Sequence, residues 1–184
     1  MKRYLMASLA GLVLLLAPAA HARQDDPRLD GLFAQLGAAT SPQEARAIEE
    51  VIWRVWIDSG DRAVDALMRL GLKAMADGNL PGALGLFDAV TVQKPDFAEG
   101  WNKRATLLYV MGQLDQSALD VERTLKLEPR HFGALSGLGL IHMARQRDQA
   151  ALAAFERALK IHPHLPGVKS NIETLKKRRS DRAI

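Results

Sequence analysis

Histidine is the residue type in this chain best suited to hold a metal ion, and His162 and His164 flank a single proline. Two imidazoles so close in sequence could supply part of a tetrahedral metal site. No pair of Asp or Glu residues with ligand spacing accompanies them. His131 is expected to lie in a loop, and His142 is expected to pack inside the fold. We therefore predict that the protein holds no metal ion.

Serine, histidine and aspartate could also perform catalysis, but they occur here without the sequence context of a catalytic site. The chain contains no nucleophile elbow and no glycine-rich phosphate loop. It also contains no cysteine, which excludes disulfides, thiolate metal ligands, a cysteine nucleophile and a lipid-modified cysteine. We predict that the protein is not an enzyme and uses no cofactor.

Residues 1–22 predict a secretory signal peptide. Lys2 and Arg3 form a positive start, an apolar stretch follows at 5–17, and Ala-His-Ala at 20–22 supplies the small residues that precede a cleavage site. The apolar stretch is shorter than the ~20 residues of a transmembrane helix, so we predict no stable membrane span after cleavage. These features predict export to a periplasm-like compartment, with anchoring by an uncleaved signal as the alternative.

Charge argues against nucleic acid as a partner. The full chain carries 25 Lys and Arg residues against 21 Asp and Glu residues. The predicted signal removes two basic residues and no acidic one, which leaves 23 basic and 21 acidic residues and a net charge of +2. A nearly neutral exported protein is not expected to bind nucleic acid.

The positions of small, apolar and proline residues recur every 34 residues. Helices that cross closely need small side chains at the contact. Proline disfavours helix at the residue before it and so separates one helix pair from the next. Four columns carry the repeat, in the order small, small, apolar and proline: Gly71, Ala105 and Gly139; Ala83, Ser117 and Ala151; Phe87, Val121 and Phe155; Pro95, Pro129 and Pro163.

These columns resemble the tetratricopeptide repeat (TPR), whose pattern is W-x2-L-G-x2-Y followed by Ala, Phe and Pro at fixed offsets. The last copy matches best, through Leu138-Gly139, Ala151, Phe155, Ala158 and Pro163. The resemblance divides the chain into three repeats, at 64–97, 98–131 and 132–165. It implies an all-α, right-handed superhelical solenoid of antiparallel helix pairs.

The segments 23–63 and 166–184 flank the repeats, and we interpret them as capping helices. In the first segment, Phe33, Leu36 and Gly37 have the Trp, Leu and Gly spacing of the repeat. We therefore interpret 23–63 as a helical pair that is either a degenerate repeat or an N-terminal cap. The second segment predicts a capping helix with a basic tail, since a helical solenoid needs a solvated cap at its end.

The TPR resemblance also implies a binding surface, because the first helix of each pair lines an extended concave face in this family. It places Asp65, Glu99, Gly133, Ser136 and Gly137 on that face, with Asn171 of the last helix extending it. From the same positions we predict a peptide-binding groove formed by Met68, Arg69, Leu72, Met75, Asn102, Lys103, Thr106, Tyr109, Leu140 and Met143.

The apolar members of this groove have two interpretations. Methionine suits a surface that accepts varied apolar partners, which favours a peptide with apolar side chains. Apolar residues at helical spacing are also typical of a core, which the N-terminal helices could complete by folding over them. TPR proteins that bind chaperone tails clamp a carboxylate with Lys, Asn and Arg. Met68 and Leu72 occupy two of those places here, so the resemblance implies no full clamp.

Arg104 departs from the repeat, because it occupies the column of Leu70 and Leu138, which is expected to face the core. A buried guanidinium needs an acidic partner. Asp88 and Asp120 are both candidates, and we interpret Arg104 as a structural ion pair in preference to a ligand-binding residue.

Trp53 and Trp56 share one side of a predicted helix and are expected to pack in the N-terminal cap, with a partner patch as the alternative. Together these features predict a non-catalytic scaffold that binds another protein or peptide in the bacterial periplasm. The alternative is a structural protein that assembles envelope complexes or self-associates through its helical faces and caps.

Overall fold

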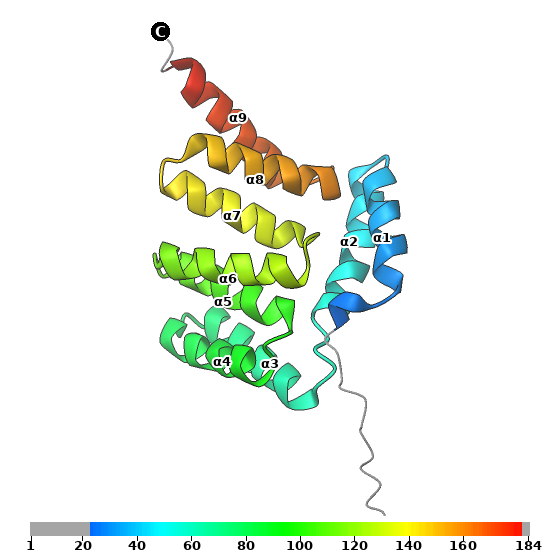
Figure 1. The fold of residues 1–184 in the computed structure, drawn as a ribbon, viewed down its shortest axis with the longest axis vertical. Coiled ribbons are helices and arrows are strands. Elements are labelled where there is room, and N and C mark those ends of the chain that lie inside the picture. The colour runs from blue at the N-terminus through cyan, green and yellow to red at the C-terminus, as the bar shows by residue number, and fades with distance from the viewer. Residues whose placement is uncertain (1–22, 182–184) are drawn as a thin grey trace, which may run out of the picture.

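The computed structural model describes residues 23–181, and every regular element in that range is helical. The predicted signal peptide, residues 1–22, lies outside the described residues. The elements are η1, a short 3-10 helix (Arg23–Asp25), α1 (Arg28–Ala38), α2 (Pro42–Trp56), α3 (Arg62–Ala76), α4 (Leu80–Gln93), α5 (Ala98–Val110), α6 (Leu114–Leu127), α7 (Phe132–Ala144), α8 (Asp148–Ile161) and α9 (Pro166–Asp181) (Figure 1).

Helices α3 to α8 form three antiparallel pairs that stack on one another, and α9 covers the end of the stack (Figure 1). The turn inside each pair requires one residue with a positive φ, and these residues are 34 positions apart. Gly78 (φ 78°) and Gly112 (φ 75°) serve the first two turns, whereas Gln146 (φ 57°) serves the third. The predicted all-α solenoid of helix pairs is confirmed.

The small and aromatic columns of the repeat meet where the two helices of a pair cross. A Cβ added to Gly71 would lie 2.6 Å from Cε1 of Phe87, and one added to Gly139 would overlap the ring of Phe155. In the middle pair the same two columns hold Ala105 and Val121. In this pair the larger Ala105 replaces glycine and the smaller Val121 replaces phenylalanine. The two changes compensate, so each crossing keeps a similar packed volume.

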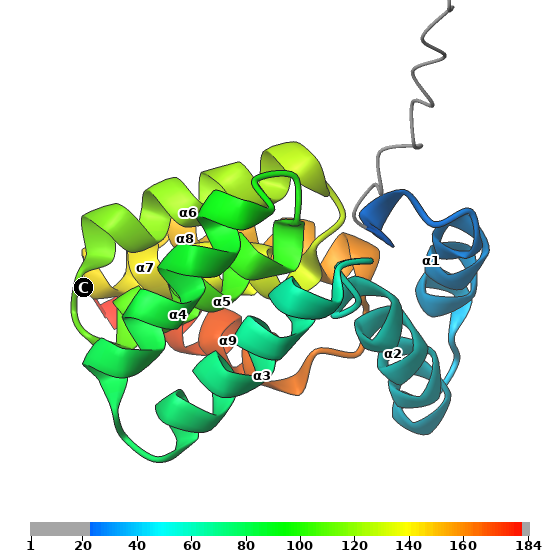
Figure 2. The same ribbon diagram turned by 90° about the horizontal axis from the view of Figure 1, so that it is seen from below.

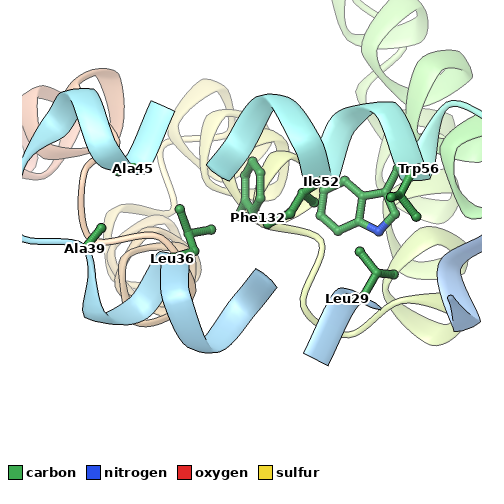
Figure 3. Packing of buried hydrophobic residues seen from close by; sticks show 8 residues of the cluster. Leu29, Leu36, Ala39, Ala45, Ile52, Trp56 and Phe132 are labelled. Atoms are coloured by element: carbon green, nitrogen blue, oxygen red, sulfur yellow. The ribbon is translucent and has the colours of Figure 1, made fainter. Parts of the chain in front are cut away.

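Helices α1 and α2 form a helical pair, called the N-terminal hairpin below, which lies beside the stack and does not continue it (Figures 1 and 2). Leu29, Leu36 and Ile52 of the hairpin are buried together with Phe132 at the start of α7 (Figure 3). Ile161 at the end of α8 and Leu165 in the loop that follows also pack against this cluster. The hairpin therefore buries its apolar face against the third pair.

The turn between α2 and α3 is held by local hydrogen bonds. Ser59 donates its hydroxyl (2.6 Å) and its backbone N–H (3.0 Å) to Oδ1 of Asp65, and Gly60 has a φ of 74°. Asp61 then caps α3 by accepting the N–H groups of Ala63 and Val64.

Among the residues that the structure describes, no helix has both the length and the apolar character needed to span a bilayer.

Candidate functional site on the inner face of the array

The inner face of the array is formed by α3, α5 and α7 and is continued by α9 (Figure 2). It contains a cavity of about 180 Å³ between α5 and α7, called the α5–α7 pocket below. Helix α5 contributes Asn102, Thr106 and Tyr109, and α7 contributes Gly133, Ser136, Gly137 and Leu140. Ser117 and Val121 of α6 also line it.

The α5–α7 pocket exists because α7 carries glycine on the side that faces α5. A Cβ added to Gly137 would have no atom within 4 Å, so the missing side chain leaves open space. A Cβ added to Gly133 would lie 3.0 Å from Cη2 of Trp53, which places the tip of that indole beside Gly133. The side chain at position 137 therefore controls how much space is available.

A second cavity of about 230 Å³, the α7–α9 pocket, lies beside the first. Phe155 and Leu165 line it from α8 and the loop that follows, while Gly167 and Asn171 line it from α9. Ser136 and Leu140 line both pockets, so these two residues of α7 form the wall between them. No charged residue lines either pocket.

A buried ionic cluster, the Glu99 cluster, closes the groove where α5 and α7 begin. The Glu99 side chain is 1% exposed, and its Oε1 lies 2.7 Å from Nζ of Lys103. Its Oε2 accepts a hydrogen bond from Nδ2 of Asn102 (2.9 Å) and lies 2.9 Å from Nε2 of His131. Lys103 Nζ also lies 5.1 Å from the ring centre of Trp53 on the N-terminal hairpin.

The Glu99 cluster keeps its carboxylate ionised. Burial has the largest influence and would by itself raise the pKa of Glu99, but the charge of Lys103 and the hydrogen bond from His131 lower it overall. Nδ1 of His131 accepts the N–H of Ala134 (3.1 Å) and thereby caps α7. His131 lies in the loop before α7, as expected. It is nevertheless fully buried, and it stacks on Trp56 with ring centres 4.2 Å apart.

The structure brings four of the ten predicted groove residues into the α5–α7 pocket. Asn102, Thr106, Tyr109 and Leu140 all line it, and Leu140 also lines the α7–α9 pocket. Lys103 stands next to the pocket but is paired with Glu99. Arg69 is exposed on α3 and lines neither pocket.

Met68 is too deeply buried to contact a ligand in the groove, which corrects the prediction for this residue, whereas Leu72, Met75 and Met143 are half-buried and line neither pocket. Met68 is 1% exposed and packs in the core shared by α3, α4 and α5, and Leu72 and Met75 contact the same core. Met143 packs against the core between α8 and α9. The alternative that these residues are core is correct for Met68, which neighbouring helix pairs cover and the N-terminal hairpin does not, while the other three stay partly exposed.

Arg104 pairs with both of the aspartates proposed for it. Its Nε and Nη2 donate to the two carboxylate oxygens of Asp120 at 2.7 Å each, and its Nη1 donates to Asp88 (2.8 Å) and to the Thr91 hydroxyl (3.0 Å). The hydrogen bond to Asp120 is the main reason that the pKa of Arg104 is raised. This geometry confirms the structural ion pair, which links α5 to α4 and α6 on the outer face.

His162 and His164 hold the N-terminal hairpin in place. Nε2 of His162 lies 3.2 Å from Oε2 of Glu49, and this hydrogen bond lowers the pKa of that carboxyl. Nε2 of His164 donates to the backbone oxygen of Ala39 (2.9 Å). Within residues 23–181, no group of three or more His, Asp or Glu side chains is arranged to hold a metal ion.

The two tryptophans are packing residues, as expected, although at a different interface. Trp56 is 2% exposed, and Trp53 lies edge-on to Phe132 with ring centres 5.5 Å apart. Trp56 is therefore not available as an exposed partner patch. Four other pocket residues were not predicted from the sequence: Ser117, Val121, Leu165 and Gly167. Ser117 and Val121 belong to columns of the repeat that indicate packing between helices. Leu165 and Gly167 lie outside the first helices of the repeats.

Comparisons with known proteins agree with this architecture. Residues 102–166 match the sequence model of the tetratricopeptide repeat. A TPR repeat-containing protein of Rhizobium etli is 45% identical over 136 residues, which are 74% of this chain and 67% of that protein.

Two solved structures share the fold at low sequence identity. The TPR domain of Sgt2 from Aspergillus fumigatus aligns with a TM-score of 0.63 and 23% identity, over 67% of this chain and 83% of that one. The Yersinia enterocolitica type III secretion chaperone SycD, solved in complex with a peptide of the translocator YopD, aligns with a TM-score of 0.60 and 14% identity, over 65% of this chain and 96% of that one.

Proposed function

Because the chain belongs to the tetratricopeptide repeat family, we propose that it is a non-catalytic scaffold that binds a peptide or protein segment on the inner face of its array. The observation that carries this proposal is the α5–α7 pocket, an open cavity between the first helices of two consecutive repeats. A preformed surface of this kind loses little conformational entropy when it binds. The peptide-bound chaperone SycD, which has the same fold, supports the proposal.

The groove does not bind its partner through a terminal carboxylate clamp. Met68 is buried in the core, and Leu72 packs against that core. Lys103 is the cation nearest to the α5–α7 pocket, and Glu99 already neutralises it at 2.7 Å. A carboxylate in the groove would therefore have to compete with a buried anion for the Lys103 ammonium.

We also propose that the protein works after export, in the periplasm. The positive start, apolar stretch and small residues at 1–22 support this location. Fractionation of cells that make the full chain, followed by mass measurement of the purified protein, would test it. A soluble periplasmic product that begins at Arg23 is the expected result, and a full-length product in the membrane fraction would favour the uncleaved anchor.

Site-specific crosslinking in the native cell tests the binding role. A photoreactive phenylalanine analogue replaces Thr106 or Tyr109, both of which line the α5–α7 pocket. Val92 on α4 is the matched control, because it is 78% exposed and lines no pocket. We expect a crosslinked protein partner from the two pocket positions and none from Val92.

The outcomes separate three functions. The same crosslinks at all three positions, or none at any of them, would contradict a specific role for the inner face. A crosslink from Tyr109 to a second copy of the chain would favour the structural, self-assembling alternative. A crosslink to a different protein that is confined to the pocket positions would support the proposed scaffold.

A further inference from the structure

The α5–α7 and α7–α9 pockets suit two side chains of one bound segment. We propose that the partner of this protein presents two bulky, uncharged side chains close together, one for each pocket, and that the groove selects against acidic segments. This inference rests on the proposed function, since it specifies the chemistry of the segment that the inner face binds. Three properties of the pockets support it.

The first property is size. The two pockets have volumes of about 180 Å³ and about 230 Å³. A protein cavity of roughly 150 Å³ is large enough to hold benzene. Each pocket therefore has room for one aromatic or branched aliphatic side chain, and neither is large enough for a folded element.

The second property is the shared wall. Ser136 and Leu140 line both pockets, and they are one helical turn apart on α7. Two side chains of a partner that fill the two pockets are thus separated only by the side chains of Ser136 and Leu140. A single short segment that crosses α7 can supply both, so the two side chains have a constant separation in the partner's sequence.

The third property is charge. The residues that line the pockets are apolar or neutral, and Tyr109 and Asn171 provide the polar groups that can bond to the backbone of a bound segment. Burying a carboxylate without a partner carries a large desolvation cost. Because the nearby Lys103 is already paired with Glu99, an acidic side chain finds no counter-charge here.

Two glycines allow each pocket to be filled separately. Gly137 lines the α5–α7 pocket and Gly167 lines the α7–α9 pocket, and a Cβ added to either has no atom within 4 Å. A side chain at either position therefore begins in open space, and we expect leucine there to extend over the pocket that the glycine lines. Gly85 is the matched control, since it lies inside α4 with the same open space and lines no pocket.

The probe is a phage-displayed library of random 12-residue peptides selected on the purified protein. We expect the recovered peptides to share two bulky apolar residues at a constant separation and to be poor in Asp and Glu. A synthetic peptide from this selection should bind Gly137→Leu and Gly167→Leu about ten- to a hundredfold more weakly than the unmodified protein, the value of one apolar side chain removed from its pocket. Gly85→Leu should bind it unchanged.

Thermal unfolding of each variant accompanies the binding measurements, and alanine at the same position replaces leucine if a variant does not fold. Acidic peptides, peptides without a pair of apolar residues, no peptide above background, or an affinity unchanged by both pocket variants would overturn the two-pocket inference. Crosslinks from Thr106 and Tyr109 would still support the proposed function in each of those cases, so the two failures are distinguishable.

Discussion

The crossing of α7 and α8 provides a quantitative test of how the repeat pattern encodes the fold. A Cβ added to Gly139 would lie 2.6 Å from Cζ of Phe155 and would also overlap two other atoms of that ring. Phe155 is fully buried, so its ring can move away only toward the α7–α9 pocket that it also lines. Adding one methyl group to a packed site of this kind costs about 1–3 kcal/mol.

Gly139→Ala should therefore lower the free energy of unfolding, even though alanine favours helix. The gain in helix propensity is about 1 kcal/mol, which leaves a net loss of up to about 2 kcal/mol. For a chain of this size that loss lowers the melting temperature by up to roughly 8 °C. Urea unfolding followed by circular dichroism measures the change directly. Gly137→Ala, two residues earlier with open space around its Cβ, should instead raise stability by about 0.5–1 kcal/mol.

The middle repeat indicates how to remove the clash. Ala105 and Val121 occupy there the positions that Gly139 and Phe155 occupy in the last repeat. Phe155→Val alone should destabilise the protein by leaving a cavity, and adding Gly139→Ala should then cost less than it does in the unmodified protein. We expect a favourable coupling of about 1 kcal/mol in the double-mutant cycle. Strictly additive effects, or a Gly139→Ala variant as stable as Gly137→Ala, would refute the steric basis of the column pairing.

Four further predictions follow from the described contacts. Gln146→Gly should raise the free energy of unfolding by about 1 kcal/mol in urea titrations, because glycine adopts its positive φ without strain. Glu99→Gln should cost roughly 1–3 kcal/mol at neutral pH, since it leaves the Lys103 ammonium without its anion. Because the pKa of Glu99 is lowered in the folded protein, the ionised carboxylate stabilises the fold above the usual value of 4.5, and this stabilisation is lost as the pH falls. Between pH 6 and pH 3 the melting temperature of the Glu99→Gln variant should therefore fall less than that of the unmodified protein. Arg104→Met should cost about 2 kcal/mol by circular dichroism, because the carboxylate of Asp120 loses a two-point ion pair in a buried place. Sedimentation of the purified protein should give a monomer, and a stable oligomer would favour the self-assembly alternative.

The helix pairs could be predicted from the sequence because their determinants are local in the repeat. Gly71 and Phe87 are 16 residues apart, and their sizes alone indicate a close crossing of two consecutive helices. The position of the N-terminal hairpin could not be predicted in this way. The spacing of Leu29, Leu36 and Ile52 indicates which sides of its helices are apolar, but any apolar surface of the array could bury them, and Phe132 is 80 or more residues away in sequence.

The groove was predictable only in part for a related reason. The first helix of each pair has one side toward its own partner, a second toward the next pair and a third toward the inner face. Sequence periodicity does not separate the last two sides when both are apolar. Met68 and Leu72 therefore fit the groove pattern although they pack between pairs, whereas Gly133 and Gly137 form the pocket through side chains that they lack.

The Glu99 cluster explains why an apolar groove can lie beside a lysine. Glu99 and Lys103 are one turn apart on α5, so the carboxylate reaches the ammonium from within the same helix. The hydrogen bonds from Asn102 and His131 hold that carboxylate in place, and His131 is itself fixed by stacking on Trp56 of the N-terminal hairpin. The hairpin thus stabilises the residues that neutralise the cation nearest to the α5–α7 pocket. From the proposed function we therefore expect the affinity of the groove to depend on the apolar surface that a partner buries, with no gain from attraction between opposite charges.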